Sequence, residues 1–391
     1  MTDRMTDSRP TGSGLSVHGS TDQNQFGEGA AERLRGWDHI ELWVGNARTT
    51  AQFFTSALGF RITAYAGPET GVPDQASYVL EQGSIRLVVT AGLSAASPIT
   101  AHVQHHGDGV RDLAWAVDDV DGAFLSAIER GARAVCPPHE RHDDGGVVRA
   151  ATVATYGETV HSFVDRSRHE GVFGPGFRAE GVPGEPPGPP VGLQRIDHVV
   201  GNVELGRLDQ WVQFYESVLG FAELLHYDDE QIRTEYSALM STVVWNGESI
   251  VLPLNEPAQG RRRSQIQEYL DTYEGPGVQH LAFATDDIVS TVRALRARGV
   301  RFLDTPPTYY QDVRDRLGHL ELPWEELGQL GILVDEDRDG HLLQIFTENI
   351  TDRPTLFLEL IQRVGSNGFG EGNFKALFEA IERQQDRRGN L

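Results

Sequence analysis

Hydrophobic and polar positions along the chain alternate between a strand-like period of two and a helix-like period of about 3.6 residues. Residues 39–45 (HIELWVG) have the strand pattern, and residues 47–60 (ARTTAQFFTSALGF) place apolar side chains at helical spacing before the glycine at position 59. Two further strands flank a glycine turn in residues 76–90. The same order then recurs with a strand at 112–117, a helix at 118–132 and strands at 148–155 and 158–165. The pattern predicts two βαβββ units in this half of the chain.

The second half of the chain repeats the scheme. Its predicted strands and helices fall in HVVGNV, RLDQWVQFYESVLGF, SALMSTVVWN, SIVLPLN, HLAFAT, DDIVSTVRALRARGV, LLQIFT and TLFLELIQR. Three sequence echoes appear in the same order in both halves: WDH and IDH, FFTSALGF and FYESVLGF, and GVRDLAWAVDD and GVQHLAFATDD. Matches in a constant order indicate a duplicated domain. We therefore predict an α+β fold of two tandem domains, each with paired βαβββ units that form an open barrel.

Composition gives the domain boundaries. Residues 1–34 are rich in Ser, Thr, Gly and Asp and are expected to form a disordered tail. The first domain is predicted at 35–166, and a Pro- and Gly-rich linker, unable to sustain helix or sheet, at 167–192. The second domain is predicted at 193–391, with an amphipathic C-terminal helix that acts as a lid and a glycine-rich hinge at 368–372 before it.

Charge and cysteine content narrow the functional classes. A net charge of −23 argues against nucleic acid and anionic membranes as partners. No apolar run approaches the length of a membrane span. The single cysteine, Cys136, excludes an intrachain disulfide framework and is typical of a cytoplasmic protein.

Three residues of the second domain are predicted to bind a metal. His198 and His280 lie at equivalent places of the two predicted units, and Glu359 lies between two leucines of a buried strand, where an unpaired carboxylate would be costly. Two imidazoles and one carboxylate are the ligand set of non-haem Fe(II) oxygenases, and Zn²⁺ is the alternative that ligand identity leaves open.

The first domain provides an internal control for this assignment. Its counterparts of the three residues are His39, Asp112 and Ser162, which leave too few ligands for a transition metal. We therefore expect it to be a metal-free scaffold or interface module. The three histidines before the turn at residues 107–109 are expected to be exposed loop residues without a metal role: His102, His105 and His106.

Several long segments of the second half resemble one known family. They are IDHVVGNVELGRL, TEYSALMS, LNEP, SQIQEYL, GPGVQHLAFATDDI, FLDTPPTYY, LLQIFT, DRPTLFLELIQR and GFGEGNFKALFEAIE. They resemble the 4-hydroxyphenylpyruvate dioxygenase family of the vicinal-oxygen-chelate superfamily, and the similarity runs from about residue 37 to the C-terminus. One departure is Leu358, since similar proteins usually carry a second Phe before the glutamate.

The resemblance implies a site and a reaction. His198, His280 and Glu359 would bind one Fe(II) per chain, and the substrate-binding and catalytic positions would be Ser241, Asn255, Gln265, Gln279, Gln344, Phe346, Phe369, Asn373 and Phe374. The substrates would be a 2-oxo acid, 4-hydroxyphenylpyruvate, and O₂, and the products homogentisate and CO₂ in tyrosine catabolism. A homo-oligomer is also expected.

Two other functions remain open at this point. A 4-hydroxymandelate synthase uses the same iron site and substrate but hydroxylates the benzylic carbon; Asn255 and the DRPT stretch at 352–355 favour the dioxygenase. A non-catalytic binding protein of the same fold would not require all three metal ligands together.

Overall fold

The computed structural model describes residues 30–179, 189–228, 238–258 and 260–389. The first domain consists of η1 (Ala30–Arg33), β1 (Leu34–Trp43), α1 (Ala47–Ser56), β2 (Arg61–Ala66), η2 (Pro68–Thr70), β3 (Gln75–Gln82), β4 (Ile85–Gly92), α2 (Pro98–His106), β5 (Gly109–Val117), α3 (Val120–Glu129), β6 (Ala134–Asp143), β7 (Gly146–Ala154) and β8 (Val160–His169).

The second domain repeats this order with added helices. It consists of β9 (Leu193–Asn202), α4 (Leu208–Gln213), η3 (Phe214–Leu219), β10 (Ala222–Tyr227), β11 (Ala238–Trp245), β12 (Val251–Ala258), α5 (Gln265–Tyr273), β13 (Gly277–Thr285), α6 (Ile288–Ala297), α7 (Pro307–Leu317), α8 (Trp324–Leu330), β14 (Leu333–Glu336), β15 (His341–Phe346), β16 (Phe357–Val364) and α9 (Glu371–Arg388).

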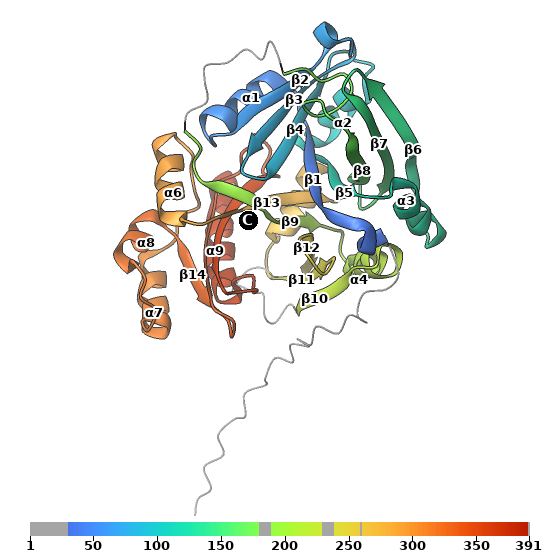
Figure 1. Ribbon diagram of the computed structural model, residues 1–391. Coiled ribbons are helices and arrows are strands. Elements are labelled where there is room, and N and C mark those ends of the chain that lie inside the picture. The colour runs from blue at the N-terminus through green and yellow to red at the C-terminus, as the bar shows by residue number, and fades with distance from the viewer. Residues whose placement is uncertain (1–29, 180–188, 229–237, 259, 390–391) are drawn as a thin grey trace, which may run out of the picture.

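Each domain forms one eight-stranded sheet, and the two sheets have the same topology. The strand orders are β2-β3-β4-β1-β5-β8-β7-β6 and β10-β11-β12-β9-β13-β16-β15-β14. In each sheet the two βαβββ units meet at a central antiparallel pair, β1 with β5 and β9 with β13. Figure 1 shows the first sheet in blue to green and the second in lime to red. The predicted fold is confirmed.

Local sequence explains where the crossover helices begin. In both domains the central strand is followed by two aspartates, and the second caps the next helix. Asp119 accepts a hydrogen bond from Gly122 N at 2.9 Å, and Asp287 accepts one from Ser290 N at 3.0 Å. An Asp at this position satisfies an amide that the helix itself leaves without a partner. In each domain, the repeated DD pair therefore marks the point where the central strand ends and the next helix begins.

The predicted segment boundaries differ from the structure in two places. Ala30–Arg33 form a short helix and Leu34 begins β1, so the end of the expected disordered tail is ordered, while residues 1–29 lie outside the described residues. β8 continues to His169, into the expected linker, and Phe173 beyond it is buried against the first sheet. This segment is held by the antiparallel pairing of β8 with β7 and by the burial of the Phe173 ring. Its Gly and Pro content alone predicted no regular structure.

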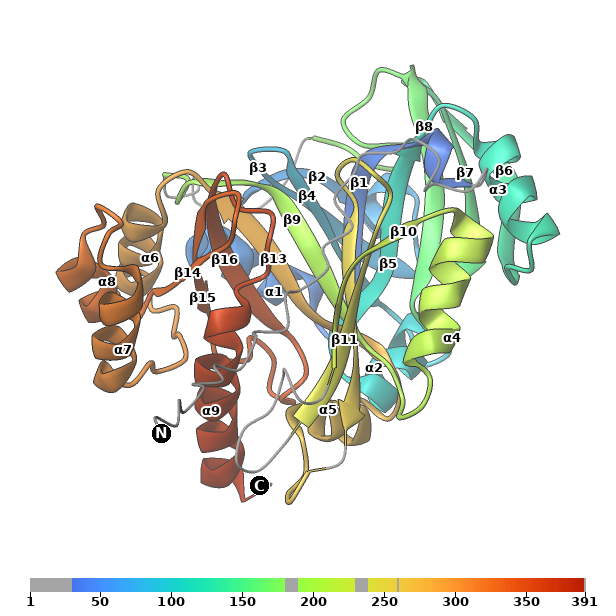
Figure 2. The ribbon, with the colours of Figure 1, turned by 90° about the horizontal axis from the view of Figure 1, so that it is seen from below.

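Aromatic side chains join the two sheets. Phe60 lies 6.1 Å from Phe283, and Trp115 lies 5.6 Å from Phe221, measured between ring centroids. All four rings are buried in one apolar cluster that includes residues of both domains. Figure 2 shows the two sheets side by side, with α9 on the second. The first domain therefore helps to hold β9 and β13, which carry the candidate ligands.

Candidate metal centre

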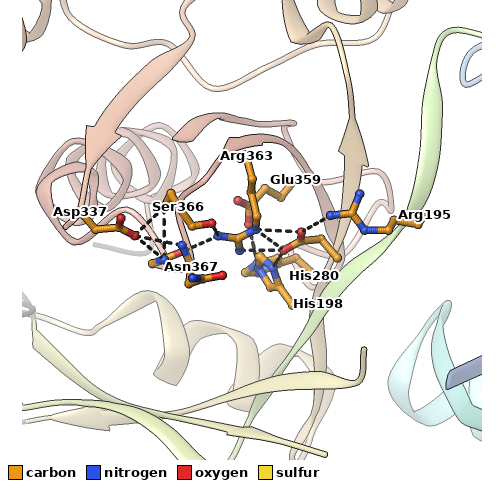
Figure 3. A network of polar contacts seen from close by, with 10 residues as sticks. Arg195, His198, His280, Asp337, Glu359, Arg363, Ser366 and Asn367 are labelled. Carbon is orange, nitrogen blue, oxygen red and sulfur yellow. Dashed lines mark hydrogen bonds and ion pairs between the residues drawn. The ribbon is translucent and has the colours of Figure 1, made fainter. Parts of the chain in front are cut away.

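The strand register brings the three predicted ligands to one point. Ala282 on β13 is paired with His198 on β9 and also with Glu359 on β16. His280 lies two residues earlier on β13, so its side chain points to the same face. His198 Nε2 is 3.1 Å and His280 Nε2 is 3.2 Å from the same Glu359 oxygen, Oε2 (Figure 3). The three residues form a buried His–His–Glu metal-binding site.

Burial and mutual attraction set the protonation of this triad. All three side chains are less than 10% exposed. Burial alone would lower the pKa of His198, but the carboxylates of Glu359 and Asp197 raise it to about 9. Burial would raise the pKa of Glu359, but the two imidazoles lower it to about 2. The carboxylate is thus ionised and attracts positive charge to the point where the imidazole nitrogens converge, which favours a metal cation there.

The outer nitrogens of both imidazoles have hydrogen-bond acceptors. His198 Nδ1 donates to Asp197 Oδ1 at 2.8 Å, and His280 Nδ1 donates to Gln279 Oε1 at 3.1 Å. These bonds direct both Nε2 atoms at the point where a metal would bind, and a metal there would displace the proton that His198 Nε2 shares with Glu359. The Gln279 side chain, predicted from the resemblance to contact substrate, therefore also orients a ligand.

Arg363 connects the ligand support to the segment before α9. Its guanidinium donates to both oxygens of Asp197, with nitrogen–oxygen distances of 2.8 to 3.2 Å. It also donates to the carbonyl of Gly368 at 2.5 Å and lies 5.3 Å from the ring centroid of Phe369. The Phe369 ring is 5.2 Å from that of His198. The contacts of this arginine and of Asp337 are drawn in Figure 3.

The predicted hinge is anchored at several points. Asp337 Oδ2 accepts hydrogen bonds from Ser366 Oγ at 2.7 Å and Gly368 N at 2.8 Å. Gly372 N donates to Asp335 Oδ2 at 2.9 Å. The glycines therefore permit close contact with neighbouring groups: a Cβ on Gly370, whose φ is +73°, would lie 2.5 Å from Gln344 Nε2. This observation favours a fixed connection to α9 over a free hinge.

The first domain has the same scaffold with different side chains. Its register pairs His39 with Ala114 and Asp112 with Val160, which places Ser162 where the second domain has Glu359. Asp112 accepts hydrogen bonds from Ser162 N at 3.0 Å and Ser162 Oγ at 2.5 Å. Burial raises the pKa of Asp112 to about 6. Because the first domain has one histidine here where the second domain has two, it does not reproduce the His–His–Glu triad.

The predicted pocket residues lie on β11, β12, α5, β13, β15 and α9 and, for Phe369, on the segment before α9. Ser241 on β11 is the register partner of Asn255 on β12. Phe346 on β15 lies 6.1 Å from the His280 ring. From α9, Asn373 Oδ1 accepts a hydrogen bond from Tyr309 at 2.5 Å, and the Phe374 ring contacts Tyr227 at 5.2 Å.

A pocket lies between α5, α9 and the start of β16; none of the three triad residues lines it, but Gln279 and Phe357, which contact His280, do. Two of the predicted residues, Gln265 and Gln279, contribute to its lining. The pocket is also lined by Phe357, whose ring stacks on His280 at 4.7 Å and 22°. The other predicted pocket residues are not part of its lining.

Sequence reasoning missed three side chains that support the triad. The resemblance singles out Leu358, the neighbour of Phe357, but Leu358 lies in the apolar core and Phe357 beside the ligands. In a strand, positions 357 and 359 share a face and 358 points to the other. Asp197 and Arg363 were also missed, although both occur in each copy, as Asp38 and Arg166 in the first. The presence of this aspartate and this arginine in both halves of the sequence was the signal that could have identified them.

The three histidines expected in an exposed loop belong to α2 instead. His102 and His106 are each only 4% exposed, whereas the His105 side chain is exposed. The expectation failed because a short polar helix shows no apolar stripe, and α2 is buried by tertiary contacts: the His102 ring packs on Trp43 of the first domain and the His106 ring on Tyr273 of the second.

Comparison with known proteins agrees with the repeated fold. A family model described as the Glyoxalase/Bleomycin resistance protein/Dioxygenase superfamily matches residues 195–345, and another with the same description matches residues 38–148. The chain is 48% identical to 4-hydroxyphenylpyruvate dioxygenase of Dictyostelium discoideum, over 92% of this chain and 100% of that protein. The identity to the enzyme of that name from Aspergillus fumigatus is 45%, over 91% and 94%. The chain belongs to the 4-hydroxyphenylpyruvate dioxygenase family.

A solved structure has a similar fold over most of the chain. A triple mutant of 4-hydroxymandelate synthase from Streptomyces coelicolor superposes with a TM-score of 0.81 at 37% identity, covering 90% of this chain and 99% of that one.

Among the described residues, no helix is both long and apolar enough to cross a membrane.

Proposed function

We propose that the protein converts 4-hydroxyphenylpyruvate and O₂ to homogentisate and CO₂, as the names of its relatives imply for the dioxygenase family. The observation that carries this proposal is the buried His–His–Glu triad in the second domain of a chain of this family. Three protein ligands leave coordination positions free on an Fe(II) ion, which suits a 2-oxo acid with two adjacent oxygen donors.

The residues present fit one Fe(II) ion held by His198, His280 and Glu359. Two imidazole nitrogens and a carboxylate oxygen, all buried and within 4.8 Å of one another, form the donor set expected for a non-haem Fe(II) oxygenase. When bound, Fe(II) would supply the redox chemistry that couples oxidative decarboxylation of the keto acid to hydroxylation of the ring.

Aromatic side chains beside the ligands would position the substrate ring. Phe346 and Phe357 both contact the His280 ring and lie 6.2 Å from each other. Phe369 lies against His198, and Phe374 comes from α9. We propose that Phe346, Phe369 and Phe374 enclose the phenyl ring and exclude water, since edge and face contacts between rings restrict orientation.

Polar residues of the predicted pocket would recognise the polar groups of the substrate. They are Ser241, Asn255, Gln265, Gln279, Gln344 and Asn373, and each is less than 10% exposed. Gln344 Oε1 and Asn373 Nδ2 are buried without hydrogen-bond partners among the described residues. Such groups are costly unless paired, so a substrate hydroxyl or carboxylate is a suitable partner.

The remaining predictions concern the whole chain. We propose that residues 193–391 form the catalytic domain and residues 35–166 the metal-free one, which the altered counterparts of the triad support. A homo-oligomer and a cytoplasmic location remain predictions, the latter resting on the lone cysteine.

The second candidate is 4-hydroxymandelate synthase, because a solved structure with that name covers 90% of the chain. The higher identity of 48% to a dioxygenase and the presence of Asn255 opposite Ser241 favour the dioxygenase. Chromatography of the products of the iron-loaded enzyme with 4-hydroxyphenylpyruvate separates the two. Homogentisate supports the proposal, 4-hydroxymandelate supports the alternative, and the absence of oxygen uptake would exclude both.

A further inference from the structure

A second cluster of metal-ligating side chains lies on α2, away from the triad. His102 and His106 are one helical turn apart and therefore share a face of the helix. The turn between β7 and β8 brings Glu158 to the same face, and the ligand atoms of all three residues lie within 4.8 Å of one another. Among the described residues, the catalytic triad is the other group that satisfies this condition.

The geometry around Glu158 places two imidazoles on one carboxylate oxygen. His102 Nδ1 is 2.5 Å and His106 Nε2 is 3.7 Å from Glu158 Oε2. The side chains of His102 and His106 are 1% and 6% exposed, whereas that of Glu158 is 51% exposed. Because Glu158 is half exposed, an ion and a water ligand can reach the two imidazole nitrogens, which are otherwise buried.

The tautomer of His106 leaves a lone pair directed at this point. Its Nδ1 lies 2.5 Å from the carbonyl oxygen of Tyr273, and a carbonyl can only accept, so Nδ1 carries the proton. In the neutral imidazole, Nε2 is then an acceptor; it faces a carboxylate oxygen, is buried, and has no hydrogen-bond partner among the described residues. Two acceptors that face each other in this way are stabilised by a cation between them.

A competing cation is present but does not occupy this position. Arg111 Nη1 is 3.9 Å from Glu158 Oε2, and its guanidinium carbon lies 4.7 Å from the Trp43 ring centroid. Within the described part of the chain, it makes no hydrogen bond to His106 Nε2.

We propose that His102, His106 and Glu158 form a second site for a divalent transition metal of the Zn²⁺ type, with water as the fourth ligand. Two imidazoles, one carboxylate and a water are a common tetrahedral set for this ion. The carbonyl of Tyr273 serves as the outer hydrogen-bond partner that such ligands usually have.

The site lies at the junction of the two domains, which suggests a structural role. Tyr273 ends α5 of the second domain, and its ring stacks on His106 at 4.6 Å. Arg353, also of the second domain, donates to the carbonyl of His105 at 2.6 Å. Figure 2 shows α2 beside α5. A bound ion would fix α2 in this contact and so stabilise the interface.

The test counts metal ions per chain after equilibrium dialysis of the full-length enzyme against buffered Zn²⁺. We expect two ions for the wild type, one for Glu158→Gln, and one for Glu359→Gln, which loses the other site. His105→Gln, an exposed neighbour on the same helix, is the matched control and should retain two. Glu158→Gln loaded with Fe(II) should keep wild-type homogentisate formation, because Glu158 is not part of the proposed active site.

A thermal melt provides a second measurement. Zn²⁺ should raise the melting temperature of the Glu359→Gln protein but not that of the protein with both Glu158→Gln and Glu359→Gln. A single ion in the wild type, or an unchanged count in Glu158→Gln, would overturn the proposal. Either result leaves the dioxygenase assignment standing, because that depends on the other site.

Discussion

The arginine that supports the triad has a matched control in the same chain. Arg363 binds Asp197 in the second domain, and Arg166 binds Asp38 in the first with distances of 2.8 to 3.1 Å. Each aspartate accepts a hydrogen bond from a histidine, and each arginine lies against a phenylalanine that also contacts that histidine. Replacement of either arginine by methionine removes the same contacts, but only one pair adjoins a metal ligand.

The expected loss of stability is similar for the two variants. The Asp197 and Asp38 side chains are 7% and 6% exposed, so each would remain as a buried, poorly compensated carboxylate. Removing one partner of a buried ion pair costs about 3–5 kcal/mol. Hydrogen bonds from His198 and His39 remain, as do Arg195 at 3.7 Å from Asp197 and Arg86 at 4.0 Å from Asp38, and they favour the lower end of this range. Urea denaturation of both variants should show free energies of unfolding reduced by about 3 kcal/mol.

The two variants should differ in metal binding. In Arg363→Met, Asp197 loses the partner that fixes it, and His198 loses its fixed orientation. Loss of such an outer partner typically lowers metal affinity 10–100-fold. Iron retention, measured after dialysis against a series of chelator concentrations, should fall in Arg363→Met and stay at the wild-type level in Arg166→Met. Arg363→Lys should restore part of it, because lysine restores the charge but not the paired geometry.

Two outcomes would refute this reasoning. Wild-type iron retention in a folded Arg363→Met protein would show that Asp197 orients His198 without the arginine. An equal loss of iron in Arg166→Met would show that both substitutions act through general destabilisation.

Four further predictions concern the site and its counterpart. Alanine at any of the three triad positions should abolish turnover and lower iron content, while His39→Ala should do neither; activity in a triad variant would contradict the assignment. Phe346→Val should loosen the substrate ring and yield 4-hydroxymandelate beside homogentisate, and an unchanged product ratio at retained turnover would show that Phe346 does not position the ring. Phe374→Ala should lower homogentisate formed per O₂ consumed, since α9 would exclude water less well; a wild-type ratio would make this side chain only structural. Asp112→Asn should stabilise the protein at neutral pH, because Asp112 has a pKa of about 6 when folded against 3.8 normally and ionisation of the buried group costs on the order of 3 kcal/mol. Wild-type stability due to this group falls as pH rises from 4 to 6, so urea denaturation should show the gain at pH 7.5 and little of it below pH 4.

The duplicated sequence pattern predicted those features of the site that are determined by the strand register of the two sheets. Corresponding residues of two repeats occupy corresponding register positions, and this relation placed His198 opposite Ala282 as it placed His39 opposite Ala114. The match of Ser162 to Glu359 likewise follows from the pairing of β5 with β8 and of β13 with β16. The sequence therefore indicated which residues meet at the triad without any knowledge of distances.

Elements held mainly by tertiary contacts escaped this prediction. β6 carries Pro137 and Pro138 and is largely exposed at the edge of its sheet, so it shows no alternation of burial. β14 is only four residues long and is also an edge strand. Part of the burial of α2 comes from Tyr273, 167 positions away from His106. Periodicity reports local amphipathicity, and none of these segments has a strong one.

The two domains show that support for a metal site and the site itself are separable. Both copies keep an aspartate, an arginine and a phenylalanine around the first histidine, so this arrangement stabilises the fold whether or not a metal binds. The buried carboxyls respond in opposite directions. Burial raises the pKa of Asp112 to about 6, where one histidine lies nearby, whereas the two imidazoles beside Glu359 overcome burial and lower its pKa to about 2. The two copies differ at two positions of this site: Asp112 stands where the second domain has His280, and Ser162 where it has Glu359. These exchanges turn a buried carboxyl that favours a proton into a pair of imidazoles around a carboxylate that favours a cation.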